Sequence, residues 1–268
     1  GFVMTYSTLA AIVKYPFASR QAVRKPKFGF FESEAEDFAR IARELGMPVE
    51  ETAAGYRSVR HPLVYLVEAA DDICYEVMDI EDAYKLRLLS PEETRQLFLA
   101  FFEVAERENL LSAYPDATDE SDRIAYLRSC VINALERACV QTFLDHEEEI
   151  LEGRFRGSLI DHLPDHLLQA YRHCVARRRI YSCREVLDVD LAGYRIIYTL
   201  LELMMDAVLE PKKAYSELLL AQVSSQYQLS APHLYDRVMA VLDYLSGMTD
   251  VYALDLYRKI NGHSLPGV

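Results

Sequence analysis

The sequence predicts an all-α protein of many helices, with room for one small β-hairpin. Apolar residues recur at the three- and four-residue spacing of amphipathic helices through most of the chain. Glycine and proline are scarce, with 10 of each among 268 residues, and no alternating strand pattern of any length is present. The sequence also lacks internal repeats and low-complexity linkers, which predicts a single helical body over residues 1–268.

Start and stop signals order the helices along the chain. The segment "SPEE" from Ser90 is a capping box with proline at the first helical position. Later helices begin near Pro211 and Pro232, and Gly247 separates the last two. Together with the periodicity, these signals predict helices over residues 2–15, 33–45, 61–83, 91–108, 120–150, 164–180, 184–209, 211–222, 231–246 and 248–261.

Two segments lack helical periodicity and are expected to be irregular. They cover residues 16–32 and 46–60. The first contains "KPKFGFF", and the small hairpin is expected there, near residues 24–32.

The charge balance narrows the class of function. With 42 acidic and 29 basic side chains the net charge is -13. This argues against a protein that coats nucleic acid, because binding many phosphates needs a basic surface. The basic residues are nevertheless uneven, and residues 14–27 carry five of them with no acid. No apolar run reaches the roughly 18 residues that a membrane span needs. We therefore expect a cytoplasmic protein with no membrane partner.

The predicted helix over residues 61–83 carries an unusual polar face. Relative to Asp71, Tyr75 lies about 40° and Asp79 about 80° around the helix axis, while the apolar residues occupy the opposite arc. A solvated face is the ordinary explanation. Aspartates are poor helix formers in mid-helix, so short carboxylates aimed at a metal ion or a sugar hydroxyl are the alternative. Periodicity alone leaves both open.

Five segments carry a family resemblance. They are "YSTLAAIVKYP" (6–16), "KFGFFESE" (27–34), "RHPLVYLVEAADDICYEVMDIEDA" (60–83), "FLDHEEEILEGRF" (143–155) and "DYLSGMTDVYALDLYRKI" (243–260). The chain resembles the deoxyguanosinetriphosphate triphosphohydrolase-like branch of the HD-domain metal phosphohydrolases. The resemblance implies a multi-helix HD-domain-like body that hydrolyses deoxynucleoside triphosphates, with dGTP the expected substrate, to deoxynucleoside and triphosphate.

The resemblance also implies roles for individual residues. Asp71 matches the last ligand of a divalent metal such as Mg²⁺ or Mn²⁺, and Tyr75 and Asp79 match positions at the deoxyribose. The chain also has residues at positions that contact phosphate in the family: Lys14, Tyr15, Lys27 and, on a looser match, Arg128. For Lys14 the plainer explanation is a cation that ends a helix.

The chain departs from the family pattern at the metal motif. Its seven histidines are never followed by aspartate, so the adjacent His-Asp pair is absent. The catalytic residues are therefore expected upstream of Gly1, residues 1–150 would complete the HD core, and 151–268 would form a C-terminal helical region. Residues 1–268 alone are expected to be inactive, and His146 with the glutamates that follow it is the weaker alternative metal site.

The resemblance leaves other classes of function open. A non-catalytic nucleotide-binding or regulatory protein without the metal site is the main alternative, and an HD phosphodiesterase acting on other phosphate esters is the third. The sequence upstream of Gly1 would separate the first two, and product analysis the last. The resemblance also implies a homo-oligomer, hexamers being common in the family, and a nucleotide or single-stranded DNA effector.

Overall fold

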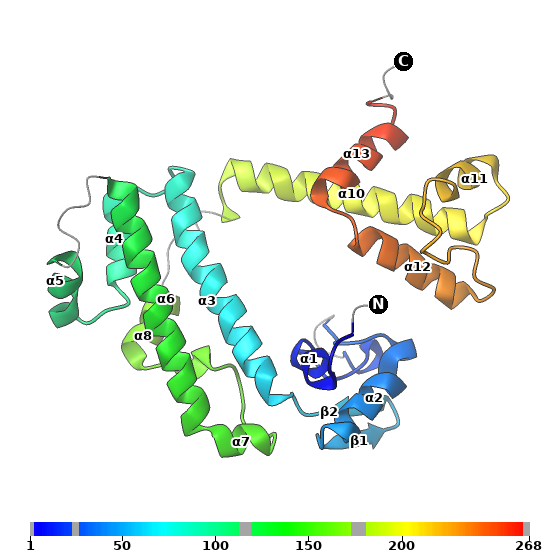
Figure 1. Ribbon diagram of the computed structural model, residues 1–268. Coiled ribbons are helices and arrows are strands. Elements are labelled where there is room, and N and C mark those ends of the chain that lie inside the picture. The colour runs from blue at the N-terminus through cyan, green and yellow to red at the C-terminus, as the bar shows by residue number, and fades with distance from the viewer. Residues whose placement is uncertain (1–2, 23–26, 113–118, 173–180, 265–268) are drawn as a thin grey trace. The chain divides into compact units, whose positions relative to one another are not determined.

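The computed structural model describes residues 3–22, 27–112, 119–172 and 181–264 and is mostly helical (Figure 1). This confirms the predicted all-α class. The chain forms two compact units, residues 1–180 and 181–268, and each is described by itself. The assignment of residues 1–150 to a catalytic core stays a prediction. None of the described helices is long and apolar enough to cross a bilayer.

The first part of unit 1 is built from short elements. In chain order these are α1 (Tyr6–Ala11), the 3-10 turns Ser19–Gln21 and Glu32–Glu34, α2 (Ala35–Glu44), β1 (Val49–Thr52) and β2 (Gly55–Ser58). Their shared core includes Phe30, stacked on Phe38 with ring centroids 4.6 Å apart, and the buried side chains Ala10, Ala42 and Met47. This small core holds the segment after α1 against the segment that precedes the next long helix.

The hairpin lies at residues 49–58 and not near 24–32, where it was predicted. Residues 23–26 are outside the described residues, and in the described remainder of that segment only an isolated bridge forms, between Phe30 and Ala18. In the observed hairpin Thr52 pairs with Gly55, whose φ of 116° few L side chains adopt. The prediction was wrong because the two-residue loop is Ala-Ala, which carries no turn signal of its own.

Two long helices form the centre of unit 1. In Figure 1, α3 (Pro62–Lys85) and α6 (Glu120–Asp145) lie side by side. Their facing side chains include Val77, Ile80, Val131 and Leu135, all fully buried. Proline at the first position of α3 and the His61 ring, which accepts the Leu63 N–H, fix where α3 begins. The register of its polar face follows from that start.

Shorter helices surround this pair. They are α4 (Pro91–Leu99), α5 (Val104–Ser112), α7 (Glu147–Leu151), the 3-10 turn Ile160–His162 and α8 (Asp165–Arg172). The helix predicted over 91–108 is divided between α4 and α5, because Phe98 and Phe101 are both buried and the chain turns to bury them together. The helix predicted over 120–150 ends earlier, at Asp145, and α7 follows His146.

Unit 2 consists of four described helices. They are α10 (Arg184–Leu209), α11 (Ala214–Leu220), α12 (Leu234–Ser246) and α13 (Asp250–Ile260). The C-terminal half of α10 contributes Leu200, Met204 and Val208 to a core that α12 completes with Val241. The segment 221–233, between α11 and α12, folds over this core through Leu229.

Candidate functional site

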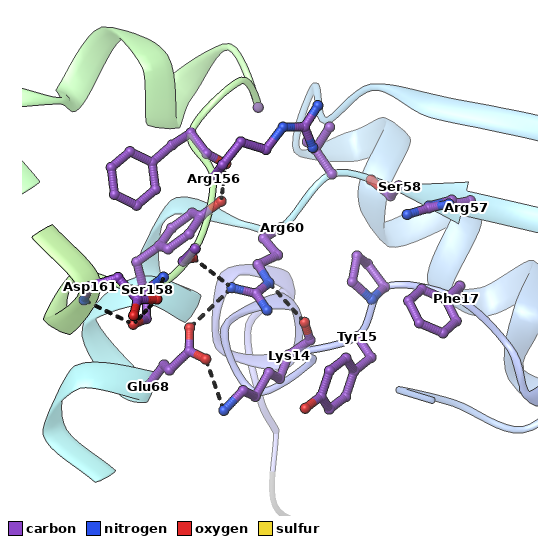
Figure 2. A pocket seen from close by; sticks show the side chains of 16 residues that line it. Lys14, Tyr15, Phe17, Arg57, Ser58, Arg60, Glu68, Arg156, Ser158 and Asp161 are labelled. Atoms are coloured by element: carbon purple, nitrogen blue, oxygen red, sulfur yellow. Dashed lines mark hydrogen bonds and ion pairs between the residues drawn. The ribbon is translucent and has the colours of Figure 1, made fainter. Parts of the chain in front are cut away.

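A cavity of about 690 Å³ lies in unit 1, where four segments distant in sequence meet (Figure 2). Residues 14–17 follow α1, residues 57–60 end β2 and lead into α3, and residues 153–161 follow α7. Tyr65 and Glu68 reach the cavity from the first turns of α3. Because the lining comes from four segments, the cavity exists only when unit 1 is folded.

Glu68 is the centre of the polar network in this cavity. Its side chain is only 8% exposed, and its two carboxylate oxygens receive different cations. The Lys14 ammonium lies 2.9 Å from Oε1, and the Arg60 Nη1 lies 3.0 Å from Oε2. Arg60 also donates from Nε to the Lys14 carbonyl, at 3.1 Å, and from Nη1 to the Gly157 carbonyl, at 3.3 Å. Glu68 and Arg60 thereby join all four segments (Figure 2).

The cavity is positively charged within an acidic protein. Its lining includes four basic side chains and two acidic ones, namely Lys14, Arg57, Arg60 and Arg156 against Glu68 and Asp161. The hydrogen bond to Glu68 holds the pKa of Lys14 above its ordinary value, and this outweighs the lowering by burial. Lys14 is therefore a fixed cation at neutral pH. The excess of positive charge suits an anionic ligand with several charged oxygens.

The rings of Tyr65 and Phe155 form an aromatic wall of the cavity next to Arg156. Tyr65 meets Phe155 edge to face, with ring centroids 5.2 Å apart, and its hydroxyl donates to the Phe155 carbonyl. The His162 Nε2 lies 2.9 Å from the Arg156 carbonyl oxygen, which fixes the backbone next to Phe155. Arg57 and Arg156 therefore come from different walls of one cavity.

Sequence reasoning placed Lys14 and Tyr15 in a site, and both line the cavity. The Lys27 ammonium lies 5.9 Å from the centre of the Tyr15 ring, and its side chain is exposed. Lys27 thus lies beside the cavity without being part of its lining. The structure thus brings Lys27 close to Tyr15 although the two residues come from separate segments.

The residues predicted on α3 lie farther along the same helix. Asp71 and Tyr75 are exposed, Asp79 is half-buried, and none of the three is among the residues that line the cavity. Glu68 precedes Asp71 by three residues and lies about 60° from it around the axis, inside the same polar arc. Sequence reasoning missed Glu68, although its position on that arc was the signal that would have found it. The polar face of α3 therefore continues from the cavity to Asp71 and beyond.

Comparison with known proteins identifies relatives over nearly the whole chain. Residues 166–259 match the family model described as the phosphohydrolase-associated domain. A "Deoxyguanosinetriphosphate triphosphohydrolase-like protein" of Pseudomonas aeruginosa is 32% identical over 99% of the chain, and one of Synechocystis is 30% identical over 99%. The chain is a homologue of these triphosphohydrolase-like proteins.

A further homologue carries the name "Deoxyguanosinetriphosphate triphosphohydrolase". It comes from Klebsiella pneumoniae and is 28% identical over 96% of the chain. The chain spans about three fifths of the length of these triphosphohydrolase-like relatives: 62% of the Pseudomonas protein, 61% of the Synechocystis protein and 60% of the Klebsiella protein.

Arg128, the loosest of the family matches, makes a structural ion pair. From α6, its Nη1 lies 2.9 and 2.8 Å from the two carboxylate oxygens of Glu81 on α3. Burial by itself would raise the pKa of Glu81, but Arg128 and then Lys85 outweigh it and hold that pKa below its ordinary value. The pair joins the two central helices. A phosphate contact for Arg128 in the triphosphohydrolase-like family pattern stays a prediction.

The metal ligands that the family pattern implies are not complete within the described part of the chain. No group of three or more His, Cys, Asp or Glu side chains in the described residues is arranged to hold a metal ion. Asp71 offers one exposed carboxylate. The alternative at His146 does not assemble either, since its ring packs against Phe155 and His162 with centroids 5.2 and 5.3 Å away. Among the described residues, Asp71 therefore supplies one candidate ligand of such a site.

Proposed function

We propose that the protein containing this chain hydrolyses deoxynucleoside triphosphates, with dGTP the expected substrate, to deoxynucleoside and triphosphate. The observation that carries the proposal is the cationic cavity, in which Glu68 fixes Lys14 one helical turn before Asp71. A cavity of this charge suits a polyphosphate. The expected reaction is that for which the triphosphohydrolase relatives are named.

The proposed roles follow the order of groups along α3. Asp71 would be one ligand of a divalent ion, Mg²⁺ or Mn²⁺, which when bound neutralises charge at the α-phosphate. Tyr75 and Asp79, one and two turns farther on, would face the deoxyribose. Asp79 is about 12 Å along the axis from Asp71, too far for both to bind one ion.

The leaving triphosphate would lie over the cavity. Lys14 and Tyr15 line it, and Lys27 lies beside it. Fixed cations stabilise a leaving group whose negative charge grows during the reaction, and they need no reorganisation because Glu68 already holds Lys14. The structure adds Arg57 and Arg156, which sequence reasoning did not identify, to this proposed set. A phosphate contact from Arg128 would require it to leave Glu81.

The decisive experiment uses the full-length protein that contains these residues. It is incubated with each dNTP and Mn²⁺ or Mg²⁺, and the products are separated to detect triphosphate. Lys14→Gln should lower kcat/KM at least tenfold, whereas Glu147→Gln, an exposed change on α7, should not alter it. Hydrolysis of other phosphate esters without release of triphosphate would favour a phosphodiesterase, and binding without turnover would favour a regulatory protein.

Further elements of the proposal concern the whole protein. We expect residues 1–268 alone to release no triphosphate, because Asp71 supplies one metal ligand and such sites use several. We also propose a cytoplasmic homo-oligomer, with a hexamer as the size to test, and a nucleotide or single-stranded DNA as effector. Sedimentation and activity with each effector would check these expectations.

A further inference from the structure

A second cavity, of about 370 Å³, is built entirely from unit 2. It lies between the end of α10, the segment after α11 and the first turn of α12, which contributes Arg237. The proposed function uses none of its residues. Its size is at the lower end of the range of small-molecule sites, about 300 to 1,000 Å³, and corresponds to one small ligand.

Arg237 has one buried hydrogen-bond donor without a partner. The side chain is half-buried, and its Nε is withdrawn from solvent without a hydrogen-bond acceptor. Within the described part of the chain no carboxylate forms an ion pair with it. A donor N–H withdrawn from water is unfavourable unless an acceptor or an anion compensates it. The molecule therefore has a cation at this cavity and no internal counterion for it among the described residues.

The rest of the lining combines hydrogen-bond donors, which suit an anion, with an apolar surface. No acidic side chain lines the cavity, although the protein has 42 of them. Three serines, Ser224, Ser225 and Ser230, bring hydroxyl donors to it. The other walls are mainly apolar, with Leu229 and the Tyr227 ring among them. A ligand that matches both parts has an anionic end and an apolar or aromatic body.

We propose that this cavity binds the phosphate group of a phosphomonoester whose organic body is apolar or aromatic. Arg237 would pair with the phosphate, and the three serine hydroxyls would donate to its remaining oxygens. A phosphate has three terminal oxygens with spare lone pairs, so it satisfies a guanidinium and several hydroxyls better than a carboxylate with two. The body would pack on Leu229 and Tyr227.

Calorimetric titration of the 268-residue chain tests the proposal. The probes are phenyl phosphate, inorganic phosphate, benzoate and phenol. Phenyl phosphate should bind saturably with one site that depends on Arg237, and each of the other three should bind that site at least tenfold more weakly. Arg237→Gln should weaken phenyl phosphate binding at least tenfold, and Arg237→Lys should weaken it less, because lysine keeps the charge but loses the planar fork.

Two control variants separate this cavity from the rest of the protein. Arg195→Gln removes an exposed arginine from α10 and should leave binding unchanged. Lys14→Gln alters the unit 1 cavity and should also leave the Arg237-dependent site unchanged, so that failure here and failure of the proposed function remain distinguishable.

A second variant, which adds a negative charge, keeps the proposal testable even if Arg237→Gln does not fold. Ser230 is exposed, so Ser230→Asp should fold normally while placing a carboxylate beside Arg237, and it should weaken binding at least tenfold. Circular dichroism checks that each variant is folded. The proposal is overturned if no saturable site appears, if Ser230→Asp binds as the parent does, or if inorganic phosphate and benzoate bind as tightly as phenyl phosphate.

Discussion

The Lys14 ammonium lies 2.9 Å from the Oε1 of Glu68, and this contact joins the segment after α1 to the N-terminal part of α3. Glu68 is almost fully buried, whereas Lys14 remains partly open to the cavity. The carboxylate therefore holds the amino group in place while leaving one side of it free for an anion.

Replacing Glu68 by glutamine should destabilise unit 1. The change removes the partner of both Lys14 and Arg60, and Arg60 is only 25% exposed, so we expect a loss of about 1–3 kcal/mol in the free energy of unfolding. Urea denaturation followed by circular dichroism measures it. Glu147→Gln, the exposed control, should leave the midpoint unchanged. Equal midpoints for the two variants would show that Glu68 does not hold the cavity together.

Alkaline pH should weaken the same contact. Hydrogen bonding to Glu68 raises the pKa of Lys14 above the 10.5 of the unfolded chain, so the native state binds this proton more tightly. The stabilisation is complete below the unfolded pKa and is lost as pH rises through the higher folded value. Urea midpoints from about pH 9 to about pH 12 should fall more steeply for the parent than for Lys14→Met. Parallel curves would contradict the assignment.

Gly29 should tolerate no side chain. A Cβ there would overlap the Tyr15 carbonyl and would lie 2.6 Å from Val13 Cγ1, because the two segments run in close contact. Gly29→Ala should cost about 1–3 kcal/mol. Gly193→Ala on α10 is the matched control: its Cβ meets nothing within 4 Å, so the helix should gain about 0.5–1 kcal/mol. Thermal unfolding compares both, and a neutral Gly29→Ala would refute the close approach.

The Arg128–Glu81 pair should govern part of the acid sensitivity. The folded pKa of Glu81 lies below the ordinary 4.5, so its contribution to stability is present above that value and is lost as pH falls through the folded pKa. Arg128→Gln should cost about 1–3 kcal/mol near neutral pH and flatten the loss at acid pH. Arg137→Gln, an exposed change on α6, is the control for urea denaturation at each pH. A variant as stable as that control would leave Arg128 free for a role at phosphate.

The helical class, most helix starts and the polar arc of α3 could be predicted because they are local. A capping box at Ser90 and proline at the first turn of α3 act within a few residues, and the structure has both. The hairpin was misplaced because its Ala-Ala loop carries no turn signal, and the break between α4 and α5 was missed because burial of Phe98 and Phe101 is a tertiary effect.

The sequence by itself determined the all-α class, the resemblance to a family, and the spacing of Asp71, Tyr75 and Asp79 on one helix. Only the tertiary structure decided that Glu68 binds Lys14 and Arg60 at once, that Arg57 and Arg156 share one cavity, and that Arg128 pairs with Glu81. The physical reason is the separation in sequence over which each interaction acts. Helical periodicity acts over a few residues, whereas these ion pairs join segments that meet only when the core has closed.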